Sequence, residues 1–380
     1  MKKDILGLYI HFPFCRRKCL YCDFPSYSGK EALMDEYMAA VKAEIDQVKK
    51  LVVEREVDTI FCGGGTPTLF SGQKLEELLT YIKDSFSVSQ KAEITIEANP
   101  ETLDRQKLEI LRRAGINRLS IGMQAGQDEH IKKLGRIHTV RDVERSVQWA
   151  RDLGFKNINL DLMFGLPNQS LDEWMESLDM ALGMDIEHLS TYGLILEEGT
   201  PFFNLQRQGH LNTPSEEVER EMYHRTGPYL QAKGYTQYEI SNFAKPGMEC
   251  RHNLIYWKNG DYIGIGGGAH SSLEGKRWSN YSDISKYIDS INDKGVGKEH
   301  GQTIPIEEQR FETIMMGLRL IEGISKLEFR ERFGQPLEYY YRDAVEILKK
   351  KAMLEENENS IYLTPKGMDF QNQLLLYFMD

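Results

Sequence analysis

The sequence predicts an α/β fold in which six strand–helix units build one parallel sheet. Short β-branched runs alternate with longer amphipathic runs six times in the first half of the chain, which is typical of βαβ units. In addition, glycine-rich or polar stretches follow five consecutive apolar runs. The alternation does not distinguish an open doubly wound sheet from an incomplete barrel. In both folds ligands bind beyond the carboxyl ends of the strands, so we expect one site where these stretches meet.

The six predicted strands are short runs rich in β-branched residues. They lie at 8–12, 59–63, 94–98, 118–122, 158–164 and 189–195. Helical patterns separate them at 31–51, 72–86, 104–114, 139–153 and 171–182. In the first of these, Leu33, Tyr37 and Val41 recur at steps of four, which places them on one face of a helix.

The pattern becomes less regular from about residue 214. We expect a helix near 215–233, a stretch rich in glycine, asparagine and aromatic residues, and a polar linker at 282–303. A smaller module follows, with helical patterns at 306–321, 325–333 and 337–350, then a hairpin and a final helix. Helices followed by a hairpin resemble a winged helix. The expected domains are a strand–helix domain at 1–235, an extension with its linker at 236–303, and a winged-helix-like module at 304–380.

The composition argues against several classes of protein. The chain of 380 residues is 41% hydrophobic and 10% aromatic, which argues against global disorder. A net charge of −11 argues against general binding to nucleic acid or anionic membranes. No apolar run approaches the roughly 20 residues of a membrane span, and the N-terminus lacks the long apolar region of a signal peptide. We therefore expect a cytoplasmic protein with reduced cysteines.

Three of the five cysteines lie within eight positions, at Cys15, Cys19 and Cys22. In a reducing compartment such a cluster indicates metal ligands or a catalyst. A structural zinc site usually takes four ligands, so it would require Cys62 or Cys250 from distant parts of the sequence. A redox pair of Cys19 and Cys22 leaves Cys15 unexplained. The remaining interpretation is an iron–sulfur cluster held by three thiolates, with one iron open to a substrate or cofactor.

The spacing Cys-x₃-Cys-x₂-Cys after the first strand resembles the radical S-adenosylmethionine (SAM) superfamily. The stretch GGGTPT (63–68) after the second strand strengthens this resemblance, because glycines there let the backbone approach a ligand. The resemblance implies a partial (β/α)₆ TIM-like barrel and a [4Fe–4S] cluster on Cys15, Cys19 and Cys22. It also implies that SAM binds the fourth iron, and that an electron from the reduced cluster cleaves SAM to a 5′-deoxyadenosyl radical.

A closer resemblance extends over nearly the whole chain. Oxygen-independent coproporphyrinogen III oxidases and their HemW-type relatives are similar to it in the stretches YIHFPFCRRKCLYCDF, GGGTPT, IEANPE, RLSIGMQ, LGRIHT, NLDLMFGLP and CRHNLIYW. This resemblance implies that Tyr9 lies against the SAM sulfonium and the cluster, and that Arg136 pairs with the SAM carboxylate. It implies that the methionine part of SAM is lined by Gly64, Gly65 and Thr66. It also implies that the ribose or amino group of SAM is hydrogen-bonded by Glu97, Gln124 and Asp161.

Within this family, the chain resembles either an oxidase or a haem chaperone. The oxidases share the pattern CxxxCxxCxC, but here Phe24 occupies the last cysteine position. They also carry a longer N-terminal segment, whereas few residues precede Tyr9. Third, HNLIYW at 252–257 matches the HNxxYW pattern of HemW-type proteins. All three features favour the chaperone, which would bind haem and deliver it to acceptor haemoproteins without coproporphyrinogen III dehydrogenase activity.

The HNxxYW pattern makes His252 the candidate haem ligand, since a neutral imidazole is a common axial ligand for haem iron. Cys250 is a weaker candidate, because a thiolate also ligates haem. Tyr256 and Trp257 could stack on a porphyrin. Each of these side chains could instead be an ordinary hydrogen-bonded or core residue.

The remaining expectations concern partners. A winged-helix module would allow a DNA-binding regulator, but the acidic tip EENEN (355–359) stands where a DNA-binding wing needs Lys or Arg. We therefore expect no nucleic-acid partner. The resemblance implies haem, SAM and a [4Fe–4S] cluster as ligands, and respiratory cytochromes at the membrane surface as acceptors. A homodimer bridged through the open iron and another radical SAM reaction on a tetrapyrrole both stay open.

Overall fold

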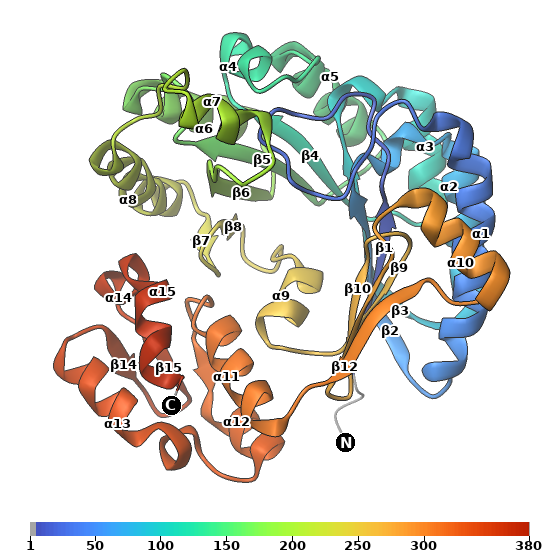
Figure 1. The fold of residues 1–380 in the computed structure, drawn as a ribbon. Helices are drawn as coiled ribbons and strands as arrows, with labels where there is room; N and C mark the ends of the chain where they lie inside the picture. The colour runs from blue at the N-terminus through green and yellow to red at the C-terminus, as the bar shows by residue number, and fades with distance from the viewer. Residues whose placement is uncertain (1–4, 380) are drawn as a thin grey trace.

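The computed structural model describes residues 5–379 and contains one large open sheet covered by helices on its outer face (Figure 1). Six parallel strands stand side by side in chain order. They are β1 (Ile5–Phe12), β2 (Glu56–Gly64), β3 (Ser87–Ala98), β4 (Arg118–Gln124), β5 (Ile158–Phe164) and β6 (His188–Gly193). The predicted parallel α/β sheet is thereby confirmed, and it takes the form of a partial barrel rather than a doubly wound sheet.

Four of the helices between these strands, α2, α3, α5 and α6, begin at side-chain caps. The side chains of Ser71, Asp104, Thr139 and Ser170 each accept a hydrogen bond from a backbone N–H of the first turn. The covering helices are α1 (Met34–Val48), α2 (Gly72–Ser85), α3 (Arg105–Arg113), α5 (Val140–Asp152) and α6 (Leu171–Gly183). Two short helices that the sequence did not predict are α4 (Asp128–Lys133) and α7 (Pro201–Arg207).

The sheet continues beyond the six strands on both sides, which the sequence did not predict. Next to β6 lies β8 (Asn242–Ala244), antiparallel to it, and β7 (Thr236–Gln237) pairs antiparallel with β8 at the edge. Next to β1 lies β9 (Tyr262–Ile265), which is parallel to it. Three antiparallel strands follow, namely β10 (His270–Leu273), β11 (Lys276–Asn280) and β12 (Lys298–Thr303).

The stretch 282–303, expected to be a polar linker, is instead helix α10 (Ile284–Lys294) followed by edge strand β12. Its overall polarity hides an apolar face, because Ile284, Tyr287 and Ile291 are buried, and the helix packs against α1. A helix needs only one apolar stripe to bury, so composition alone was misleading here.

The C-terminal module has a hydrophobic core of its own. Its helices and three-stranded antiparallel sheet follow the winged-helix-like order that the sequence predicted. They are α11 (Ile306–Gly317), β13 (Ile324–Ser325), α12 (Lys326–Phe333), α13 (Leu337–Lys350), β14 (Leu354–Glu356), β15 (Ser360–Leu363), α14 (Pro365–Asp369) and α15 (Gln371–Leu374). Between residues 5 and 379, no helix is long and apolar enough to span a membrane.

Two further helices connect the barrel to this module. Helix α8 (Glu216–Ala232) lies on the same side of the molecule as α14, to which it is joined by the ion pair of Arg220 with Asp369, and α9 (Arg251–Trp257) lies between β8 and β9 in the chain (Figure 1). A bidentate ion pair between Arg277 and Glu312, with N–O distances of 2.7 and 2.8 Å, joins β11 to α11. The module therefore contacts the edge of the barrel sheet.

Candidate functional site

The loop after β2 passes so close to the cysteine-bearing loop that Gly65 has no room for a side chain. A Cβ on Gly65 would lie 2.6 Å from the Phe14 carbonyl oxygen, 2.8 Å from that of Phe12 and 3.0 Å from Cys15 Sγ. The backbone nitrogens of Gly65 and Thr66 donate hydrogen bonds to these two carbonyls, each at 2.8 Å. Thr66 Oγ1 also donates to Cys15 Sγ at 3.6 Å. The glycine stretch therefore fixes the position of Cys15.

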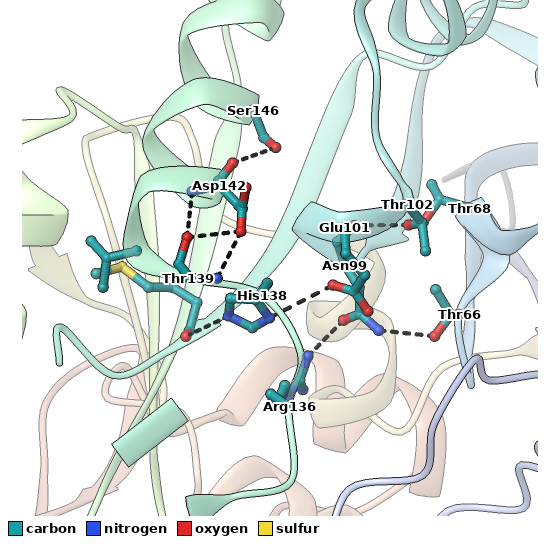
Figure 2. A network of polar contacts seen from close by, with 12 residues as sticks. Thr66, Thr68, Asn99, Glu101, Thr102, Arg136, His138, Thr139, Asp142 and Ser146 are labelled. Atoms are coloured by element: carbon teal, nitrogen blue, oxygen red, sulfur yellow. Dashed lines mark hydrogen bonds and ion pairs between the residues drawn. The ribbon is translucent and has the colours of Figure 1, made fainter. Parts of the chain in front are cut away.

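A chain of hydrogen bonds runs from Thr66 to Arg136 (Figure 2). Asn99 Nδ2 donates to Thr66 Oγ1 at 2.9 Å, and Arg136 Nη1 donates to Asn99 Oδ1 at 2.6 Å. Arg136 Nη2 donates to the Tyr21 hydroxyl in the cysteine-bearing loop at 2.9 Å. Arg136 Nε is buried and has no hydrogen-bond partner among the described residues. A guanidinium oriented by two partners and keeping a free N–H is suited to a carboxylate ligand.

His138, two residues after Arg136, anchors the same loop (Figure 2). Its Nδ1 lies 3.7 Å from a Glu101 carboxylate oxygen, and its Nε2 lies 3.2 Å from the Met123 carbonyl oxygen. The next residue, Thr139, forms a capping box with Asp142 at the start of α5. These contacts hold the loop at both of its ends and so restrict the orientation of Arg136.

Two half-buried carboxyl groups lie on neighbouring parts of the sheet, Glu97 near the end of β3 and Asp161 in the middle of β5. Burial, and then the charge of Asp161, raises the pKa of Glu97 to about 8. Glu97 Oε2 accepts a hydrogen bond from the backbone nitrogen of Gly64 at 3.1 Å. Burial also raises the pKa of Asp161, which accepts hydrogen bonds from Asn159 Nδ2 at 2.8 Å and Ser120 Oγ at 3.3 Å. Carboxyl groups with such raised pKa values favour a ligand that brings positive charge or hydrogen-bond donors.

Gln124 ends β4 in a strained backbone conformation. Its φ is 70°, in the left-handed region that side-chain-bearing residues rarely occupy, and it is buried. A Cβ on Gly122 would lie 2.7 Å from Gln124 Nε2 and 3.0 Å from Arg136 Nη1. The amide of Gln124 and the guanidinium of Arg136 therefore share the space over Gly122.

Tyr9 lies on β1 and is linked to the cysteine-bearing loop through His11. The Tyr9 hydroxyl lies 2.9 Å from His11 Nδ1, and His11 Nε2 lies 2.9 Å from the Pro25 carbonyl oxygen. Burial lowers the pKa of His11 to about 4, so the ring is neutral near pH 7. Because a carbonyl only accepts, Nε2 carries the proton and Nδ1 accepts from Tyr9. Tyr9, His11 and Pro25 thus form one ordered chain.

The cysteines differ in environment. Cys15 is buried, Cys19 and Cys22 are partly exposed, and burial raises the pKa of Cys15 and Cys22. Within residues 5–379, no three His, Cys, Asp or Glu side chains form a group that could hold a metal ion as they stand. The three thiols nevertheless suit an iron–sulfur cluster, because they are free and lie in one short loop. Gly65, which lies against Cys15, has no side chain that would crowd this loop. Cys62 and Cys250 are both buried elsewhere.

His252, expected to be a haem ligand, is fully buried on α9. Its Nδ1 lies 2.7 Å from Thr59 Oγ1, and its Nε2 lies 2.8 Å from the Tyr256 hydroxyl. The ring stacks on Phe61 with 5.2 Å between centroids, and burial lowers its pKa to about 3. Both ring nitrogens are therefore occupied. In this structure His252 does not present a free nitrogen to haem iron, and its role as a haem ligand stays a prediction.

Cys250 and Tyr256 are also engaged within the protein, whereas Trp257 Nε1 is buried and has no hydrogen-bond partner among the described residues. Cys250 Sγ donates to Glu93 Oε1 at 3.6 Å, and Tyr256 packs edge-on against Tyr262 with 4.6 Å between centroids. The Arg319 guanidinium lies 5.7 Å from the Trp257 ring. These contacts support the structural interpretation of the motif.

Three residues of the strand-end site were not identified from the sequence. Asn99 and Tyr21 orient Arg136, and His11 orients Tyr9. Asn99 and His11 lie in the stretches IEANPE and YIHF that carry the family resemblance, and Tyr21 lies between Cys19 and Cys22. Their place inside these stretches was a signal that the sequence carried. For Asn99 and Tyr21 the hydrogen-bond partner, Arg136, lies in a distant part of the chain and could not be inferred from the local sequence.

Comparisons with known proteins agree with this geometry. Residues 9–181 match the Radical SAM superfamily, and residues 304–370 match the HemN C-terminal domain. The chain is 41% identical over 372 residues to the heme chaperone HemW of Bacillus subtilis, with 98% of each chain covered. It is 38% identical over 384 residues to heme chaperone HemW of Escherichia coli, covering 100% of this chain and 99% of the relative. The chain belongs to the HemW family.

The relation of this HemW-family chain to the oxidases is seen in the fold. The structure of Escherichia coli coproporphyrinogen III oxidase HemN superposes with a TM-score of 0.86, covering 99% of this chain and 90% of that one. Sequence identity over this match is 22%, so the likeness concerns the fold alone. The predicted partial radical SAM barrel with its small C-terminal domain is therefore confirmed.

Proposed function

We propose that this chain is a haem chaperone that binds haem and passes it to acceptor haemoproteins. The observation that carries the proposal is its similarity to heme chaperones named HemW along the full length of both chains, at 41% identity in the case of Bacillus subtilis. Full-length similarity covers the C-terminal module as well as the barrel. The similarity to the oxidase, at 22% identity, supports a shared fold without carrying the oxidase activity over.

In this proposal the cysteine-bearing loop carries a [4Fe–4S] cluster on Cys15, Cys19 and Cys22. A bound cluster with one open iron supplies a site for SAM and an electron for its cleavage. Gly65 lets the loop after β2 pass close to Cys15, and Thr66 donates a hydrogen bond to that sulfur. Arg136, with its unpaired Nε, would bind the SAM carboxylate.

The remaining SAM contacts follow from the same strand ends. Glu97 and Asp161, whose pKa values are raised by burial, would accept hydrogen bonds from the ribose hydroxyls or the amino group. Gln124 lies beside Arg136 and would contribute its amide. Gly64 would line the methionine part, and Tyr9, which His11 holds in place, would lie against the sulfonium.

Phe24 argues against oxidase activity. It stands where the oxidases have a further cysteine, and its side chain is 61% exposed on the cysteine-bearing loop. A phenylalanine offers no thiol for a ligand or a radical relay. We therefore propose that coproporphyrinogen III is not a substrate.

We further propose that the chain works in the cytoplasm and meets acceptor cytochromes at the membrane surface. Its net charge of −11 favours specific protein contacts over general adsorption to anionic lipid. The open iron of the cluster is a route to a homodimer, which size measurements with and without SAM would detect.

An anaerobic experiment tests the proposed function. The cluster is reconstituted to about four irons per chain, and one portion receives reductant, SAM and coproporphyrinogen III. A second portion is titrated with hemin and followed at the Soret band. We expect saturable binding of hemin and no divinyl product by mass spectrometry. Formation of the divinyl product would assign the chain to the oxidases, and an absence of saturable hemin binding would refute the chaperone.

A further inference from the structure

Arg118, the first residue of β4, is a buried cation inside the barrel, where it is only 2% exposed. Side chains alternate between the two faces of a strand, so Arg118 lies on the same face as Ser120. Ser120 Oγ accepts a hydrogen bond from Asn159 Nδ2 at 2.7 Å and donates one to Asp161 at 3.3 Å. This face is therefore the interior of the barrel, and Arg118 lies deeper in it than Asp161.

The guanidinium of Arg118 has no partner of opposite charge. Within residues 5–379 it forms no hydrogen bond and no ion pair, and its Nε is buried. The carboxylate of Glu93, on the neighbouring strand β3, is already bound to α9. It accepts hydrogen bonds from the backbone nitrogens of Arg251 and His252 at 3.0 and 3.1 Å, and a third from the Cys250 thiol. A buried charge without an ion pair is unfavourable, so Arg118 indicates a place for an anion.

The other ionisable groups of the interior do not supply this anion. Burial, and then the charge of Arg118, lowers the pKa of His188, and lowers that of His252 to about 3, so both rings are neutral near pH 7. Burial raises the pKa of Glu97 to about 8, so this carboxyl group is mostly protonated at the same pH. The Asp161 carboxylate accepts hydrogen bonds from Asn159 and Ser120 and forms no ion pair with Arg118. The interior of the barrel thus keeps one cation for a ligand.

A ligand can approach this cation from the mouth of the barrel. On β6, His188, Ser190 and Tyr192 lie on the interior face, and Ser190 Oγ donates to Asn159 Oδ1 at 3.2 Å. Tyr192, at the mouth end of this row, is 40% exposed. Asp161 is half-buried, and Arg118 follows below it. Exposure therefore decreases inward from the mouth, and Arg118 lies at the inner end of the path.

The chemistry of a guanidinium selects the class of ligand. Its planar fork binds a carboxylate through two parallel hydrogen bonds. Haem carries two propionate carboxylates, which are the anionic groups of the proposed cargo. Arg118 also lies within electrostatic reach of Cys250 and Glu93, and Glu93 binds the first turn of α9. A carboxylate on Arg118 would therefore lie next to the helix that carries the HNxxYW pattern.

We propose that the Arg118 guanidinium binds a haem propionate inside the barrel, beside the start of α9. The inference deepens the proposed chaperone function and rests on it. Arg118 is then a specificity residue, because it distinguishes a tetrapyrrole with free carboxylates from one without them.

The test compares hemin with hemin dimethyl ester, in which both propionates are esterified, by titration of the full chain at the Soret band. Arg118→Gln removes the charge, and Arg118→Lys keeps the charge without the planar fork. We expect the parent chain to bind hemin about tenfold more tightly than the ester, because a charge-assisted hydrogen bond contributes about this factor. Arg118→Gln should lose this preference, and Arg118→Lys should keep part of it. Arg113→Gln, at an arginine 62% exposed and paired with Glu76, is the matched control and should bind as the parent chain does.

Thermal melting without ligand distinguishes a binding role from a structural one. Because Arg118 has no partner in the free chain, Arg118→Gln should melt at the same temperature as the parent chain or higher. Hemin should raise the melting temperature of the parent chain more than that of the variant. A lower melting temperature of Arg118→Gln in the absence of ligand would make Arg118 a structural residue and overturn the inference.

The remaining outcomes separate the inference from the proposed function. If the parent chain binds hemin and its ester equally well, or if Arg118→Gln keeps the preference for hemin, the inference is overturned while the chaperone function stands. Weaker SAM binding by Arg118→Gln with unchanged hemin binding would assign the guanidinium to SAM and would also overturn it. If the parent chain binds no hemin saturably, the proposed function fails together with the inference.

Discussion

The strand-end site and helix α9 both carry family motifs, but they use buried polar groups in opposite ways. At the strand ends Arg136 keeps a buried N–H without a partner, and burial raises the pKa of Glu97 to about 8. Around α9, His252 has both ring nitrogens bonded, and the Glu93 carboxylate accepts hydrogen bonds from two backbone N–H groups and a thiol. Buried polar groups are normally satisfied. The unpaired Arg136 N–H therefore supports a binding role for the strand-end site, whereas the polar groups around His252 are satisfied within the protein. Trp257 Nε1, at the end of α9, differs from its neighbours, because it is buried without a hydrogen-bond partner among the described residues.

The largest effect that this comparison predicts is loss of the cluster. Replacing Cys15, Cys19 or Cys22 by Ala should reduce iron from about four per chain to near zero after anaerobic reconstitution, because each thiol supplies one ligand. Cys62→Ala and Cys250→Ala are the controls, since both of these thiols are buried away from the loop. Iron content and visible absorbance measure the result. A full four-iron cluster in all three loop variants would contradict the assignment.

The next effect concerns stability. His252→Ala should lower the free energy of unfolding by about 2–5 kcal/mol, because it opens a cavity and leaves Thr59 and Tyr256 without their partner. Urea denaturation measures this, with His300→Ala expected to change stability by less than about 0.5 kcal/mol. If His252→Ala kept full stability and lost hemin binding, α9 would be a binding element after all.

Glu97 should make the free energy of unfolding depend on pH. Its pKa in the folded chain, about 8, lies above the ordinary value of 4.5. Between these values the folded state binds a proton that the unfolded state has released, so this group makes stability fall as pH rises through that range. Glu97→Gln should remove a slope of up to about 1.4 kcal/mol per pH unit. Urea denaturation from about pH 5 to pH 8 tests this against Glu31→Gln, an exposed control. Identical slopes in the parent and the Glu97 variant would show that Glu97 is not held in this way.

The smallest effect is on SAM affinity. Arg136→Gln should weaken SAM binding by about tenfold, since it removes a charge-assisted hydrogen bond worth roughly 1.5 kcal/mol. Iron content should not change, because Arg136 contacts Asn99 and Tyr21 rather than a cysteine. Isothermal titration with the reconstituted protein measures the affinity. Equal SAM affinity in the variant would remove Arg136 from the site.

Local patterns predicted the central part of the fold well. Six strands and the helices between them follow from periodicity, and the cysteine and glycine stretches gave the family. The flanking strands β7 to β12 were missed because they are short or polar and obtain their order from pairing. Strand β9 pairs with β1 and β8 with β6, and the other four pair with these or with one another. Whether such a short segment forms a strand depends on the strand with which it pairs more than on its own sequence.

The site itself was only partly predictable. The sequence placed Glu97, Asp161 and Arg136 at strand ends or loops, but their partners come from distant segments, as with Arg136 and Tyr21. The burial of His252 depends on Thr59 of β2 and Phe61 beside it. Motifs name residue types, whereas burial and hydrogen-bond saturation are properties of the assembled chain.

Haem transfer tests the central claim most directly. The chain loaded with hemin is mixed with increasing concentrations of an apo-cytochrome, and the rate of appearance of the acceptor's Soret band is measured. We predict a rate that rises with acceptor concentration and then saturates, because the chaperone delivers haem within a complex. A rate that is independent of acceptor concentration and equal to the rate of hemin loss to a scavenger would mean passive release, and would contradict the account.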